Sequence, residues 1–183
     1  MSAGLALLLV VAWSVVFFFR TESWRRALPA YDRAERFWVV CTPVALSVHF
    51  SVFGASLAAG APVGMWRGIV GALVFAFGIG LWLSGRVAVG PVRVRRLPDD
   101  PPLRFRRDGP FGAVRNPLAC GMLIAALAPL VVRPSGILLL TFLAGATGLV
   151  VRVFQEERRM LAQLGPVYEA YQRDVKRLIP FVW

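Results

Sequence analysis

Residues 135–153 read Ser135-Gly-Ile-Leu-Leu-Leu-Thr-Phe-Leu-Ala-Gly-Ala-Thr-Gly-Leu-Val-Val-Arg-Val153, and the chain continues without a break into Glu157. This apolar run is close to the ~20 residues that an α-helix needs to cross a bilayer. A second apolar run, 117–132, precedes it, and only a short connection separates the two. We therefore expect two neighbouring antiparallel membrane helices. Small residues suit a tight hairpin between them: Gly121 and Ala125 on the first, Gly145 and Gly148 on the second.

The whole chain has the composition of an integral membrane protein. It has 183 residues, of which 57% are hydrophobic, and its mean hydropathy of +0.64 is too high for a soluble domain of this length. Further apolar runs lie at 3–19, 37–59 and 66–84. The sequence thus predicts an all-α bundle of five transmembrane helices, followed by a cytoplasmic C-terminal amphipathic helix.

We expect one membrane domain over 1–183. Residues 1–84 form its N-terminal three-helix part. Residues 85–183 hold a linker rich in Arg and Pro, the helical hairpin and the tail. Neither part resembles a separate soluble domain.

The basic residues are distributed unevenly about the predicted spans. The net charge is +11, yet of the 21 Lys and Arg only Arg67 and Arg133 fall on one side; the others share the opposite side with all ten acidic residues. Because basic loops stay in the cytoplasm, the N-terminus is predicted outside and the tail inside, in the cell inner membrane. The excess charge then indicates contact with anionic membrane lipids rather than with nucleic acid.

The cysteines and the histidine carry little chemistry. Cys41 and Cys120 lie near the cytoplasmic ends of predicted spans, so we expect no disulfide. No pattern of Cys and His predicts a metal site. His49, the only histidine, falls near the middle of a span, where we expect it to be packed or hydrogen-bonded between helices.

Arg115-Asn116-Pro117 is the first motif that indicates a site. Asn is a preferred N-cap and Pro suits the first helical position, so a helix begins here. Arg115 stands directly before it, and a guanidinium beside free helix N–H groups suits an anion such as a carboxylate. The alternative for Arg115 is an anchor to lipid phosphate.

Glu156 and Glu157 follow the last apolar run. Projected as a helix, one stripe contains Val150, Phe154, Glu157, Leu161 and Leu164. Glu157 is thus predicted to face inward, where a carboxylate in a membrane protein needs a cationic partner. The alternative is that both glutamates pair with Arg152, Arg158 and Arg159 on a solvated helix, and this suits Glu156 better than Glu157.

Gly165-Pro166 predicts a helix stop, and an amphipathic helix is expected over 167–178. Its apolar face is formed by Tyr168, Tyr171, Val175 and Leu178, whereas Arg173, Lys176 and Arg177 lie outside. Such a helix lies on the membrane surface. Its two tyrosines could also cover a ligand held over Glu157.

These motifs occur in an order that resembles the isoprenylcysteine carboxyl methyltransferase and phospholipid methyltransferase superfamily of integral membrane enzymes. The family's usual pattern is Gly-Pro-Tyr, then Arg-His-Pro-x-Tyr-x-Gly, then a Glu-Glu pair at the end of the next helix. Here the corresponding residues are Gly109-Pro110-Phe111, Arg115-Asn116-Pro117-x-x-x-Gly121, Glu156-Glu157, Tyr168-x-x-Tyr171 and Ile179-Pro180. Asn116 stands where the pattern has His, and Ala119 where it has Tyr. The resemblance covers roughly 85–183.

The resemblance implies S-adenosylmethionine as the cofactor. It implies methyl transfer to a lipophilic acceptor (an isoprenylcysteine-like carboxylate, a lipid amine or a hydrophobic thiol) at the cytoplasmic membrane face. The implied cofactor-binding residues are Arg115, Asn116, Pro117, Gly121, Glu156, Glu157, Tyr168 and Tyr171. In this interpretation Arg115 and the helix N-terminus hold the cofactor's carboxylate, and Glu157 holds its ammonium. Glu157→Ala is then expected to abolish cofactor binding with little loss of folded protein.

Two other functions are compatible with the sequence. One is a nicotinamide-dependent membrane reductase of the sterol-reductase type. The other is a non-catalytic membrane scaffold whose motif has decayed. No catalytic residue is assigned, since methyl transfer to a carboxylate or thiolate needs no general base.

Overall fold

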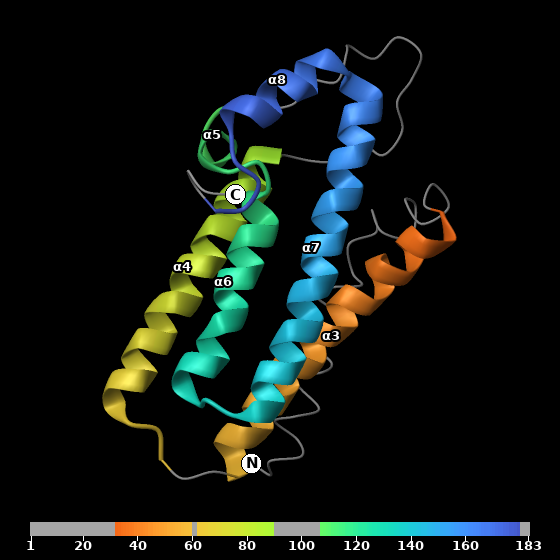
Figure 1. Ribbon diagram of the computed structural model, residues 1–183. Coiled ribbons are helices and arrows are strands. Elements are labelled where there is room, and N and C mark those ends of the chain that lie inside the picture. Colours follow the sequence, from red (N-terminus) through yellow and green to blue (C-terminus); the bar gives the residue numbers. More distant parts are fainter. Residues whose placement is uncertain (1–31, 60–61, 90–106, 180–183) are drawn as a thin grey trace.

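The computed structural model describes residues 32–59, 62–89 and 107–179, and all regular structure in these ranges is helical (Figure 1). The helices are α3 (Arg33–Ala59), α4 (Met65–Val89), α5 (Pro110–Ala113), α6 (Pro117–Val132), α7 (Gly136–Leu164) and α8 (Pro166–Asp174). Three of them, α3, α4 and α7, are long and apolar enough to cross a membrane, and α6 is a shorter apolar helix. These helices confirm the expected helical class and indicate a membrane protein. The predicted span 3–19 lies outside the described residues.

Polar residues set the helix ends, and they extend two helices beyond their apolar runs. α3 begins with a reciprocal capping box, in which Glu35 N donates to Asp32 Oδ1 at 2.7 Å and Asp32 N donates to Glu35 Oε2 at 3.2 Å. In α7, Ser135 Oγ accepts from Leu138 N at 3.3 Å. α7 then continues past the bilayer-length run to Gly165, whose φ of 52° is the left-handed conformation that glycine tolerates. Glu157 is therefore helical.

The helices pack as two pairs, α4 with α6 and α3 with α7 (Figure 1). α6 and α7 are in contact, as their short connection predicts, but the prediction that small residues pack these two helices tightly against each other is wrong. Gly121 faces α4, where a Cβ would lie 2.6 Å from the Gly78 carbonyl oxygen. Gly145 and Gly148 face α3 instead. Small residues allow two helix backbones to approach closely. The short connection between two helices does not determine which neighbouring helix those small residues face.

His49 joins three helices, as expected of a packed histidine. It is fully buried in α3; its Nε2 lies 2.9 Å from the Ala126 carbonyl oxygen of α6, and its Nδ1 lies 2.8 Å from Thr141 Oγ1 of α7. Because a carbonyl only accepts, Nε2 carries the hydrogen and Nδ1 accepts from the threonine hydroxyl. Both ring nitrogens are thus used in holding the helix pairs together.

Charge separates the two ends of the bundle. α5, α8 and the end of α7 lie at one end (Figure 1), and every acidic residue in the described ranges belongs to this end. Glu35 forms an ion pair there with Arg159, which ties α3 to α7. Arg67 and Arg133 lie together at the opposite end, at the start of α4 and after the end of α6.

Candidate functional site

The chain beyond α8 lies alongside the segment that leads into α6. Arg115 N donates to the Lys176 carbonyl at 2.8 Å, and Asn116 N donates to the Arg177 carbonyl at 3.2 Å. Leu178 is buried in a cluster with Val114. The helix predicted over 167–178 therefore ends early, at Asp174, because backbone groups of the next residues bond to another segment. We call residues 175–178 the tail segment.

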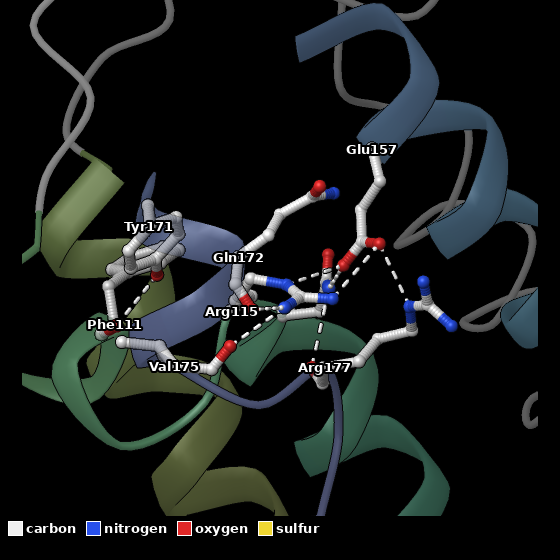
Figure 2. Close-up of polar contacts among 8 residues, drawn as sticks. Phe111, Arg115, Glu157, Tyr171, Gln172, Val175 and Arg177 are labelled. Carbon is white, nitrogen blue, oxygen red and sulfur yellow. Dashed lines mark hydrogen bonds and ion pairs between the residues drawn. The ribbon is translucent and has the colours of Figure 1, made fainter. Parts of the chain in front are cut away.

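Glu157 lies at the centre of a buried ion cluster, shown in Figure 2. The side chain is only 4% exposed. Its Oε1 accepts from Arg115 Nε at 2.9 Å and from Asn116 Nδ2 at 3.0 Å. Its Oε2 accepts from Arg177 Nε at 2.8 Å and from Arg115 Nη2 at 3.3 Å. Since a carboxylate offers about four lone-pair sites, the protein itself fills all of them. The predicted inward orientation of Glu157 is confirmed.

Arg115 binds the carboxylate and the tail segment at once. The side chain is 7% exposed, and its Nη1 donates to the Gln172 carbonyl at 2.8 Å and to the Val175 carbonyl at 2.7 Å. With Nε and Nη2 on Glu157, every nitrogen of the guanidinium has an acceptor within the protein. Arg115 thus fixes the tail segment over the start of α6 (Figure 2).

Arg177 is the residue of this cluster that the sequence did not reveal. It was placed on the outer face of the last helix, but the helix ends before it and the side chain turns to Glu157. Its guanidinium carbon lies 4.2 Å from the ring centroid of Phe154, a favourable cation–π distance. Phe154, predicted on the buried stripe, is 38% exposed; the buried stripe of α7 runs through Leu149, Val153 and Glu157.

The cluster contains one more positive than negative charge. Two guanidinium groups surround one carboxylate, and removing such charges from water is costly unless their geometry is nearly ideal. The hydrogen bonds to Glu157 and to the tail carbonyls meet that condition. Among the described residues of this cluster, the net charge favours an anion as the ligand over a third cation.

Glu156 does not join the cluster. It is 56% exposed and forms a pair with Arg152, one turn earlier in α7, at 3.7 Å. This is the solvated arrangement that the sequence favoured for Glu156 over Glu157. Ion pairs of this exposed kind contribute little to stability.

The two tyrosines of α8 are buried, and Tyr171 joins α8 to α5. Tyr171 OH donates to the Phe111 carbonyl at 2.7 Å, and the Tyr168 ring centroid lies 5.8 Å from that of Tyr171. Burial raises the pKa of Tyr171 to about 12 and also raises that of Tyr168. Both phenols are therefore protonated at physiological pH, so they act as hydrogen-bond donors and packing groups rather than as bases.

The remaining predicted residues lie at or near the start of α6. Asn116 occupies the N-cap position, but its side chain donates to Glu157 and to the Arg177 carbonyl instead of capping the helix. Pro117 is the first residue of α6, and Gly121 packs against α4 one turn further on. The structure therefore gathers Arg115, Asn116, Glu157, Tyr168 and Tyr171 at one end of the bundle.

Comparison with protein-family models, with curated proteins and with solved structures finds no match for this chain. The resemblance to the membrane methyltransferases rests on the motif residues and their order along the chain.

Proposed function

We propose that the protein is an S-adenosylmethionine-dependent methyltransferase that acts on a lipophilic acceptor at the cytoplasmic membrane face. Its supporting observation is the convergence of the motif residues. Arg115 and Glu157 are 42 residues apart in sequence yet bond to each other in a buried cluster, with Tyr168 and Tyr171 close by. Charged groups inside a membrane protein are costly and commonly mark function. The proposal includes five spans in the cell inner membrane, with the N-terminus outside and the tail in the cytoplasm.

The charges of the cluster suit the methionine part of the cofactor, which carries an ammonium and a carboxylate. Glu157 is the partner for the ammonium, but its acceptor sites are filled, so one donor must leave. Arg177 is the donor that lies on the tail segment, and at 21% it is more exposed than Arg115. We therefore propose an exchange, in which the ammonium replaces Arg177 on Glu157 and the carboxylate pairs with Arg177. Such an exchange gives the ammonium a carboxylate partner and gives the cofactor's carboxylate a guanidinium partner.

The chemistry supplied by the cofactor is a methyl group on a sulfonium. The protein must align the acceptor with that methyl and exclude water. Neither buried tyrosine serves as a base, and the oxygens of Glu157 are occupied. This set of groups favours an acceptor that is already anionic, a carboxylate or a thiolate, over a lipid amine that must lose a proton.

Cofactor binding is the direct test of this function. Purified protein in detergent should be stabilised by S-adenosylmethionine and by its demethylated product. At a ligand concentration of about 100 times Kd the gain is about 2.7 kcal/mol, which corresponds to a rise in Tm of roughly 5–11 °C. No shift with either compound would contradict the proposal, and a shift with a nicotinamide dinucleotide would favour the reductase. Methyl-labelled cofactor, incubated with host lipid extract, would then identify the acceptor.

The exchange at Arg177 makes a prediction of its own. Wild-type protein should bind S-adenosylmethionine about tenfold more tightly than its decarboxylated analogue, because a hydrogen-bonded charge pair contributes roughly 1.5–3 kcal/mol. Arg177→Ala should remove this preference, since the variant has no cation for the carboxylate. Equilibrium binding of the two compounds measures it. Arg173→Ala, an exposed arginine in the last turn of α8, is the matched control and should keep the preference. An unchanged preference in Arg177→Ala would refute the exchange.

A non-catalytic scaffold is the second candidate, and one observation favours it. The protein's own side chains saturate Glu157, as expected of a cluster whose task is to fasten the tail segment. A scaffold binds neither the methyl donor nor a nicotinamide cofactor, so the binding experiment separates the two candidates.

A further inference from the structure

Gln172 of α8 lies beside the buried ion cluster, but only its backbone takes part in the cluster. Its carbonyl oxygen accepts from Arg115 Nη1 at 2.8 Å, whereas its side-chain amide forms no hydrogen bond with the part of the chain that the structure describes. Figure 2 shows this side chain extending from α8 toward Glu157 of α7. The residue is half-buried, so a ligand can reach the amide. Gln172 therefore places an unused polar group next to the site.

Asn116 offers a second unused acceptor in the same place. Its Nδ2 donates to Glu157 Oε1 at 3.0 Å and to the Arg177 carbonyl at 3.3 Å. Its Oδ1 belongs to the same planar amide and so lies close to Glu157, yet it accepts no hydrogen bond from the described residues. A side-chain amide carries both donors and an acceptor. In Asn116 the donors are used by the protein and the acceptor is left for a ligand.

The acceptors around Glu157 match the donors of an ammonium in number. Four hydrogen bonds fill the carboxylate, and in the proposed exchange only the position of Arg177 Nε becomes available. An ammonium carries three N–H donors. One position on Glu157 satisfies one of them, and burying the other two without partners would be costly. The amide oxygens of Asn116 and Gln172 supply the two acceptors that are still needed.

We infer that the side-chain carbonyl of Gln172, together with that of Asn116 and the Glu157 carboxylate, holds the ammonium of S-adenosylmethionine and selects ligands that carry it. This role rests on the proposed function and adds Gln172 to the site. Both amides are neutral, so Glu157 remains the counter-charge of the ammonium. A ligand without an amino group offers these acceptors no donor, and the site therefore reads the amino-acid end of the cofactor.

Binding of analogues to the protein in detergent tests this role. Wild-type protein should bind S-adenosylmethionine more tightly than its deaminated analogue, in which hydrogen replaces the amino group. Gln172→Met keeps the length of the side chain without its polar atoms, and it should lower this preference about tenfold. Gln172→Glu retains an acceptor and should keep the preference. In Gln172→Met the preference over the decarboxylated analogue should not change, because Arg177 is still present.

Gln163 provides the matched control. It is exposed in the last turn of α7, and Gln163→Met should bind all three compounds as the wild type does. Every Gln172 variant retains the backbone carbonyl that accepts from Arg115, so the Tm without ligand should change little. Gln172→Ala, which also removes the amide, should show the same loss of preference and serves if Gln172→Met does not fold.

The failure of this inference differs from the failure of the proposed function. If the wild type does not bind S-adenosylmethionine, both are wrong. If it binds the cofactor and the deaminated analogue equally, or if Gln172→Met keeps the wild-type preference, only the role of Gln172 is overturned. An equal loss of affinity for all three compounds in Gln172→Met would also overturn it, since the residue would then only shape the site.

Discussion

Glu157→Ala should destabilise the protein by about 3–5 kcal/mol, because it leaves Arg115 buried without its carboxylate. Both arginines and Asn116 lose an acceptor together, and the tail segment loses its link to α7 through Arg177. This expectation reverses the one drawn from the sequence, in which the variant loses only cofactor binding. Thermal or denaturant unfolding in detergent, followed by circular dichroism, measures the change.

The neighbouring residue provides the control for this experiment. Glu156 is exposed and bonded only to Arg152 among the contacts described, so Glu156→Ala should change the free energy of unfolding by no more than about 0.5 kcal/mol. The two variants remove the same group from adjacent positions of one helix. If both unfold like the wild type, the buried ion cluster does not contribute to stability.

Gly78→Ala should produce the second large effect, by forcing α4 away from α6. A Cβ at Gly78 would collide with the backbone of Ala125 and lie 2.7 Å from the Gly121 carbonyl oxygen. Backbone atoms cannot rotate aside as a side chain can, so the helices must separate. The expected loss is about 1–3 kcal/mol or more, seen as a lower Tm in detergent.

A glycine two residues further along α4 is the matched control. A Cβ at Gly80 would meet nothing within 4 Å, so Gly80→Ala should be neutral or slightly stabilising, as Ala favours the helix more than Gly does. Equal effects of the two substitutions would show that α4 and α6 are not closely packed at Gly78.

The helices were predictable from the sequence because an apolar run long enough to cross the bilayer is expected to be helical. The run 117–132 coincides with α6, and 66–84 lies within α4. The polar ends of α3 and α7 were harder to predict. The capping box at Asp32 and the continuation of α7 to Gly165 lie outside the apolar runs. Helix pairing was not predictable, because a glycine allows close approach to any neighbour.

The site was predictable only in part. Helical spacing was enough to turn Glu157 inward and leave Glu156 outside. It could not reveal that Arg115 and Glu157 bond to each other, since they lie on different elements. Arg177 was missed for a different reason. It lies in the irregular tail segment, whose Lys176 and Arg177 carbonyls accept backbone hydrogen bonds from Arg115 and Asn116, and no periodic pattern marks so short a segment.

The order in which these residues are synthesised has a consequence for biogenesis. Arg177 follows Glu157 by 20 residues, which at ordinary translation rates is a delay of roughly 1–4 s. Until the tail segment is in place, the partners that remain for Glu157 are Arg115 and Asn116, and a paired carboxylate is easier to bring into an apolar bundle than a bare one. The surplus cation arrives once α7 has been made. Assembly of the site is therefore a late event, and the position of the tail segment reports that the preceding helices have found their places.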